Sequence, residues 1–301
     1  MFRRYLVWST VVLILSCASA VRAQTPADYQ SVLTALGRAG DFKDAVLKVN
    51  IPRSDLKVTI AQRPAPTPFG FGGWVAMTKA TDGGEVLMGD LVLTEDEVNP
   101  VMSALLQNGL EVTALHNHFF HEQPRIFFMH VHGMGNAADL AQRLKPALAL
   151  IPKPPAAPPA AQPAAAAPAS LDTASLAKTI GHEGEQSGPV YKITMGRDDI
   201  DLREHGAKIN ARMGLNTWAA FAGTDADAMV AGDVAMLAPE VTPVLKALRS
   251  NGIEVVAIHH HMTGTSPTVF FLHYYGTGPA SKLAAGVRAA VDQLGKQPAT
   301  H

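Results

Sequence analysis

The sequence predicts an α+β protein built from two homologous copies of one unit, each a largely antiparallel sheet with helices on one face. Two observations lead to this class. The chain repeats itself colinearly over most of its length, and within each copy the apolar patterns alternate as β-α-β-β-α. A ferredoxin-like layout is our prediction for the topology of each copy.

The repeat is visible at positions that random similarity does not preserve. Matched pairs keep their order and a nearly constant spacing along the chain: Trp74 with Trp218, Gly89-Asp90 with Gly232-Asp233, Asn108-Gly109 with Asn251-Gly252, His116-x-His118 with His259-x-His261, and His130 with His273. The period is far longer than a solenoid repeat, so the copies are two domains or two halves of one pseudo-symmetric body.

The clearest element within a copy is a helix over 95–107. Val98, Val101 and Leu105 form one apolar stripe at helical spacing, Thr94 with Glu97 forms a capping box, and Gly109 follows as a stop signal. We expect strands over 85–91, 111–119 and 125–132 around this helix. A closing helix is expected over 136–148, with its counterpart over 279–294.

The N-terminal segment and the middle of the chain differ in composition from the two repeat units. Residues 1–23 combine the basic pair Arg3-Arg4, a short apolar stretch and small-residue cleavage sites, which predicts a signal peptide and a periplasmic or secreted protein. Cys17 leaves a lipoprotein as the alternative. Residues 152–170 are a Pro/Ala tract typical of a semi-rigid linker, which leaves repeat unit 1 at 24–151 and repeat unit 2 at 171–297.

The overall composition excludes several classes of function. A hydrophobic fraction of 47% and a charged fraction of 17% argue against wholesale disorder. The net charge of −1 gives no basis for a nucleic-acid footprint. We expect no transmembrane segment in the mature chain. The single cysteine lies in the leader, so a zinc–thiolate site or a cysteine nucleophile is not expected.

Histidines lie on two of the predicted strands, 111–119 and 125–132, which are joined by a short loop. His-x-His on a strand projects both imidazoles to the same face. If His118 opposes Ile126, then His116 opposes Phe128 and His130 lies on the same face. A trio of this kind is expected once in each copy: His116, His118 and His130, and again His259, His261 and His273.

Three imidazoles with an open position suit a metal ion, with zinc or copper as the candidates. Asp90, Asp233, Glu111 and Glu254 are candidate carboxylate ligands or partners that orient the rings. The alternative is that these histidines are ordinary polar members of strand ends. The copies also differ, since His132 in the first copy is replaced by Tyr275 in the second, so two sites would not be identical.

Several of these segments together resemble a known family. The segments are Arg53-x-Asp55-Leu56-Lys57-Val58, Gly89-Asp90-Leu91-Val92-Leu93-Thr94, Glu111 to His118 with its His-Asn-His end, and Pro124-Arg125-x-Phe127-Phe128. They are similar to the LppY/LpqO family of bacterial secreted proteins and lipoproteins. The resemblance implies an exported bacterial protein and a domain of unassigned function. His259-His260-His261 departs from its His-Asn-His pattern.

The function favoured by the sequence is binding of a divalent transition metal through strand histidines, for metal-dependent catalysis or for metal handling. The alternative is a non-catalytic envelope module that binds a small molecule or a protein partner. The motifs identify neither a reaction nor catalytic residues.

Overall fold

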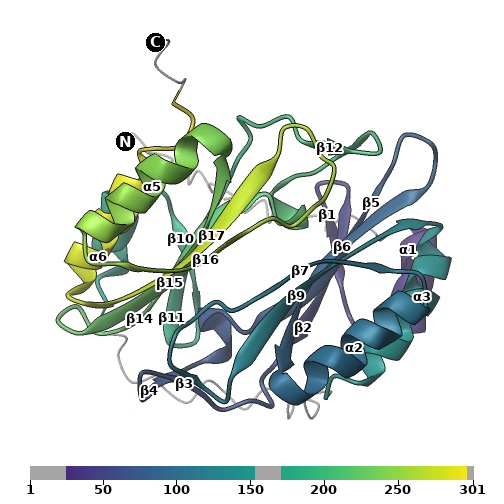
Figure 1. Ribbon diagram of the computed structural model, residues 1–301, viewed down its shortest axis with the longest axis horizontal. Coiled ribbons are helices and arrows are strands. Elements are labelled where there is room, and N and C mark those ends of the chain that lie inside the picture. The colour runs from purple at the N-terminus through teal and green to yellow at the C-terminus, as the bar shows by residue number, and fades with distance from the viewer. Residues whose placement is uncertain (1–24, 153–170, 297–301) are drawn as a thin grey trace, which may run out of the picture.

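The protein has four layers, in which two sheets lie face to face and helices cover the outside of each (Figure 1). The computed structural model describes residues 25–152 and 171–296. The predicted signal peptide and nearly all of the predicted linker lie outside these described residues. Within them, no helix has both the length and the apolar character that crossing a membrane requires.

The first copy contains a six-stranded antiparallel sheet in the order β1-β2-β5-β6-β9-β7 and three helices. Its elements are α1 (Ala27–Leu36), β1 (Asp41–Lys43), β2 (Val46–Pro52), β3 (Val58–Ile60), β4 (Arg63–Ala65), the 3-10 helix η1 (Thr67–Phe69), β5 (Gly72–Lys79), β6 (Glu85–Thr94), α2 (Glu95–Gln107), β7 (Glu111–His116), β8 (Glu122–Gln123), β9 (Ile126–Gly135) and α3 (Ala137–Ala149).

The second copy repeats this order as β10-β11-β14-β15-β17-β16, which confirms the predicted duplication and the α+β class. Its elements are α4 (Thr173–Ile180), β10 (Gly184–Ser187), β11 (Val190–Gly196), β12 (Arg203–Glu204), β13 (Ala207–Lys208), the 3-10 helix η2 (Ala211–Met213), β14 (Asn216–Gly223), β15 (Ala228–Leu237), α5 (Ala238–Ser250), β16 (Glu254–His259), β17 (Val269–Gly278) and α6 (Ala280–Val291).

The run β6-α2-β7-β9-α3 is the predicted β-α-β-β-α pattern. The helix α2 has the predicted bounds and the Thr94–Glu97 capping box, because its first turn is acidic and its apolar stripe faces the sheet. Strand β9 inserts between β6 and β7, as in a split βαβ unit. The layout differs from a ferredoxin-like sheet in two respects. Strand β5, which pairs with the far side of β6, precedes this run instead of following it, and β2 and β1 extend the sheet beyond β5.

The outer face of each sheet forms an ordinary core with its own helices. In the first copy this core includes Leu91, Val101, Leu105 and Leu140, all shielded from solvent. The equivalent core of the second copy includes Val234, Val244, Leu248 and Leu283. Both strands β6 and β9 are buried along nearly their whole length, so their inner faces must also be covered.

The inner faces are covered by the other copy. The connection between β2 and β5 carries η1, which packs against β11 and β14 of the second copy, while η2 packs against β2 and β5 of the first. Two mixed apolar clusters result: Phe69 and Phe71 join Ala220 and Ala222 in one of them, and Met213 joins Met88 in the other. Each copy therefore completes the core of its partner copy.

Two buried arginines anchor these connections. Arg53 is 1% exposed and binds Asp55, Glu97 and the carbonyl of Val92. Arg197 occupies the matched position in the second copy and binds Asp199 and Glu240. Because each guanidinium is saturated by groups of its own copy, these pairs are structural ion pairs and leave no donor for a ligand.

Candidate functional site

Six histidines meet at the centre of the molecule, where the edge strands β7 and β16 lie beside each other. They are the six singled out by the sequence: His116, His118, His130, His259, His261 and His273. Strand β7 contacts β16, and Thr113 Oγ1 donates a hydrogen bond to the carbonyl oxygen of His261 at 2.6 Å. The inner faces of both sheets therefore supply imidazoles to one cluster, which we call the histidine cluster.

The register that brings them together is the predicted one. His116 opposes Phe128 on β9, and a bulge between Val112 and Ala114 places Ala114 opposite His130. In the second copy His259 opposes Phe271 and Ala257 opposes His273, with a bulge at the same place. All six side chains consequently face the partner copy.

The rings are arranged with approximate twofold symmetry. His118 stacks on His273 with ring centroids 3.5 Å apart, and His261 stacks on His130 at 4.0 Å. His116 and His259 stack on each other at 3.7 Å, at the centre of the cluster. Phe128 and Phe271 close the two ends, with centroids 3.2 Å from His118 and 3.4 Å from His261.

The histidines group across the copies, which corrects the expected trios. Two sets of three rings have nitrogens that all lie within 4.8 Å of one another: His116, His118 and His273, and His116, His130 and His259. The expected set of His116, His118 and His130 is not among those found in the described residues. The prediction was wrong here because it considered one sheet alone, whereas the third nitrogen comes from the facing sheet.

Many of the ring nitrogens have no protein partner. Among the described residues, both nitrogens of His118, His259 and His261 are buried without a hydrogen bond, as are Nδ1 of His116 and Nε2 of His130. Burial of a polar nitrogen without a partner costs free energy, so such groups in a native protein call for an explanation such as a bound ion.

Burial also keeps the imidazoles neutral. Desolvation lowers the pKa of His116 to about 3 and places the pKa of His118, His130, His261 and His273 well below the usual value. The pKa of His259 is lowered for the same reason, with nearby histidines adding to the effect. A neutral imidazole has one free lone pair, which is the form that binds a metal.

Two aspartates adjoin the cluster. Asp90 is the cross-strand neighbour of His130, and Asp233 is that of His273. Asp233 Oδ2 lies 4.0 Å from His261 Nε2, and one oxygen of Asp90 is buried without a partner. Burial raises the pKa of Asp90 to about 7 and that of Asp233 well above its usual value. Of the four carboxylates considered from the sequence, these two lie at the cluster.

The other sequence candidates have different surroundings. Glu111 has an exposed side chain and lies 3.8 Å from His132, and Glu254 is exposed at the start of β16. His132 Nε2 lies 2.9 Å from Glu204 Oε1 of the second copy, an ion pair that raises the pKa of His132 against the effect of burial. His132 therefore connects the two copies outside the histidine cluster.

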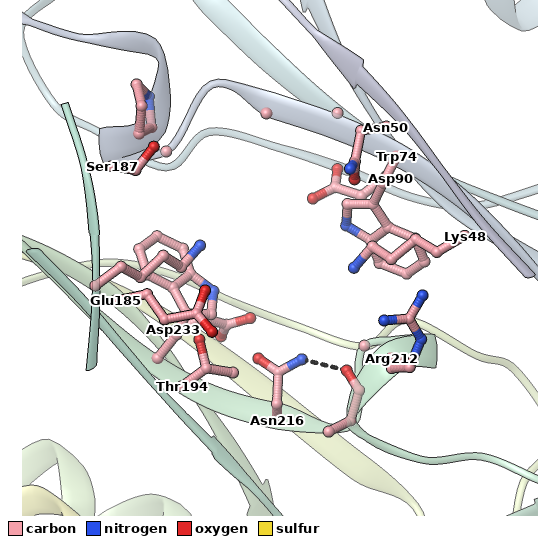
Figure 2. A pocket seen from close by; sticks show the side chains of 18 of the residues that line it. Lys48, Asn50, Trp74, Asp90, Glu185, Ser187, Thr194, Arg212, Asn216 and Asp233 are labelled. Atoms are coloured by element: carbon pink, nitrogen blue, oxygen red, sulfur yellow. Dashed lines mark hydrogen bonds between the residues drawn. The ribbon is translucent and has the colours of Figure 1, made fainter. Parts of the chain in front are cut away.

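A cavity of about 780 Å³ opens beside the histidine cluster, between the two sheets. His118, His261 and His273 form part of its wall together with Asp90 and Asp233. Figure 2 shows side chains of both copies pointing into it: Lys48, Asn50, Trp74 and Asp90 from the first copy, and Glu185, Thr194, Arg212, Asn216 and Asp233 from the second.

Sequence reasoning missed the basic part of this cavity. The sequence assigned no role to Lys48 and Lys192, and it showed Trp74 and Trp218 only as matched positions of the repeat. The tryptophans do border the apolar clusters, but they also line the cavity. The sequence does carry a lysine at the same position of a strand in both copies, but this repetition does not show that the two ammonium groups share one cavity.

The fold and the cluster define a class: a duplicated α+β protein whose two facing sheets hold a cluster of six histidines, and five of these, all except His261, have nitrogens grouped so that they could hold a metal ion. The chain belongs to the family described as Domain of Unknown Function (DUF1259), whose model matches it twice, over residues 30–150 and 174–293. No curated protein matches the sequence.

Three solved structures show a distant likeness. The crystal structure of EtuB from Clostridium kluyveri is 8% identical, with 85% of this chain and 91% of that chain covered at a TM-score of 0.21. The trimeric bacterial microcompartment shell protein PduB is 13% identical, with 84% and 92% covered at 0.18. The double ringed trimeric shell protein MSM0271 from the RMM microcompartment is 12% identical, with 69% and 82% covered at 0.17. TM-scores this low carry no inference.

Proposed function

We propose that the protein binds a transition metal ion, zinc or copper, through the histidine cluster at the interface of its two copies. The observation that carries this proposal is the convergence of buried imidazole nitrogens that lack protein partners, drawn from both sheets. Imidazole is a ligand that both metals accept, and three nitrogens leave a position open for a substrate or a further ligand.

The spacing of the nitrogens supports the proposal. Zn–N bonds are about 2.0 to 2.1 Å long, which places neighbouring ligand nitrogens of one ion roughly 3.0 to 3.4 Å apart. His116 Nε2 and His273 Nε2 are 3.1 Å apart. The carbonyl oxygen of Gly232 lies 3.3 Å from His273 Nδ1, as expected for the partner that fixes the tautomer of a metal-binding histidine and leaves Nε2 free.

The location proposed for this activity is the periplasm or the exterior of the cell, on the basis of residues 1–23. The resemblance to the LppY/LpqO family supports the same location. In an exported protein without a disulfide, a metal that joins the two copies would also stabilise their association.

Metal analysis of the purified protein tests the proposal. The chain without residues 1–23 is loaded with zinc or copper, dialysed and analysed by mass spectrometry. The variants are His116→Ala/His118→Ala and His259→Ala/His261→Ala, with His182→Ala, an exposed histidine, as the control. We expect near-stoichiometric metal in the parent chain and in the control, and loss in both double variants. A metal-free parent chain, or equal metal in all variants, would overturn the proposal.

A further inference from the structure

The cavity beside the histidine cluster has the size and the charge of a ligand site. Its volume of about 780 Å³ falls within the range of small-molecule pockets, and the walls come from both sheets. In this wall Lys48 on β2 and Lys192 on β11 occupy matched positions, so the duplication presents two ammonium groups to one space.

Neither ammonium group has a carboxylate partner in the part of the chain that the structure describes. Within residues 25–152 and 171–296, no ion pair or hydrogen bond joins Lys48 Nζ or Lys192 Nζ to another side chain. Each lies over an indole ring instead, with Lys48 Nζ 4.4 Å from the Trp74 centroid and Lys192 Nζ 4.1 Å from that of Trp218. A cation–π contact compensates only part of the cost of taking a charge from water.

The two lysines also influence each other. Desolvation lowers the pKa of both to about 8, and the positive charge of Lys192 adds to the effect on Lys48. Two ammonium groups that repel each other in one cavity are both stabilised when an anion enters between them.

The remaining charges narrow the class of anion. Arg212 is held by Asp41 at 2.5 Å through one nitrogen only, and its Nε is buried without a partner, so this guanidinium keeps one donor for an anion bound by the lysines. No α-helix begins among the residues that line the described cavity, and carboxyl groups on the same wall oppose the entry of a dianion: Asp90, Asp233, Glu183 and Glu185. These features favour a carboxylate, whose single charge matches a lysine, over a phosphate.

We propose that this cavity binds a small organic carboxylate through the ammonium groups of Lys48 and Lys192, with the rest of the molecule extending toward the histidine cluster. The ligand lies against Trp74 and Trp218, whose rings border the same space. The lysines hold the carboxylate without a metal, so this inference goes beyond the proposed function and does not depend on it.

Tryptophan fluorescence provides a direct test. The chain has three tryptophans, and one of them, Trp8, is absent once residues 1–23 are removed, so the emission reports only on the two cavity residues. Chelator-treated protein is titrated with succinate, citrate and benzoate, with inorganic phosphate and uncharged succinamide as comparators. We expect a saturable change with at least one carboxylate and none with succinamide.

Variants connect that signal to the lysines. Lys48→Met/Lys192→Met should weaken carboxylate binding by about tenfold or more, since two charge-assisted contacts are lost. Lys145→Met, on the exposed surface of α3, should leave it unchanged. Absence of a saturable change with all three carboxylates would overturn the proposal. So would tighter binding of phosphate, or unchanged affinity in a double variant with the parent circular dichroism spectrum.

Discussion

His116 Nε2 of the first copy lies 3.1 Å from His273 Nε2 of the second copy, although the two residues are separated by just over half the chain. The contact exists only because the two sheets pack against each other through their inner faces, which are not covered by helices. A single copy would hold His116, His118 and His130 with no facing imidazole. The histidine cluster therefore requires both copies, and the duplication does not simply produce two equal sites.

His116 belongs to both sets of converging nitrogens, whereas His118 belongs to one. We expect His116→Ala to lower metal affinity by more than about 100-fold, beyond the usual effect of losing an outer-shell partner. His118→Ala should retain metal through His116, His130 and His259. Competition with a chromophoric chelator measures both affinities, and equal losses in the two variants would contradict the shared role of His116.

The ion pairs of the buried arginines should contribute much more to the free energy of unfolding than an ion pair on the surface does. Replacing Arg53 with methionine leaves Glu97 and Asp55 without their cation, which should lower the free energy of unfolding by about 3 to 5 kcal/mol. The control is Arg63→Ala, which removes an exposed pair with Asp227 and should cost less than about 1 kcal/mol. Urea unfolding followed by circular dichroism compares them, and similar losses would show that the buried network contributes little.

The sequence was most informative wherever a periodic pattern had one buried face. The helix at Glu95–Gln107 was predicted to the residue because its stripe and its capping box agree. The pairing of His116 with Phe128 was also predicted correctly, since alternation along a strand fixes which side chains share a face.

The pairing of the two sheets could not be obtained in the same way. Strands β6 and β9 are apolar on both faces, which indicates that a second layer packs on the inner face of the sheet. The pattern does not say which part of the chain forms that layer. The cover is the other copy, with η1 and η2 exchanged between them. For this reason the predicted trios stayed within one copy, and neither the pairing of His132 with Glu204 nor the two cavity lysines could be derived.

Gly232 lies on β15 at a position where close packing on the helix-covered face of the sheet admits no side chain. A Cβ atom there would lie 2.2 Å from the carbonyl oxygen of Trp218 and from the ring of Tyr274. We expect Gly232→Ala to lower the free energy of unfolding by about 3 kcal/mol and to alter the emission of Trp218. Gly72→Ala is the matched control, because no atom lies within 4 Å of its added Cβ. Equal stability of the two variants in urea would contradict this packing.

Carboxylate binding in the cavity should weaken as the pH rises from 7 to 9. The pKa of Lys48 and that of Lys192 are lowered to about 8, so each ammonium loses its charge in this interval, and a bound anion favours the charged form. The groups that act on Lys48 are Lys192, Arg212, Asp41 and Asp90, and those that act on Lys192 are Asp233 and Asp90.

Fluorescence titrations with the best carboxylate should show a loss of affinity of about tenfold across these two pH units. Lys48→Arg/Lys192→Arg is the matched variant, since a guanidinium remains charged throughout. Its affinity should stay nearly constant over the same interval. A parent protein whose affinity does not change with pH, or an arginine variant that follows the parent curve, would show that the lysine charges do not hold the ligand.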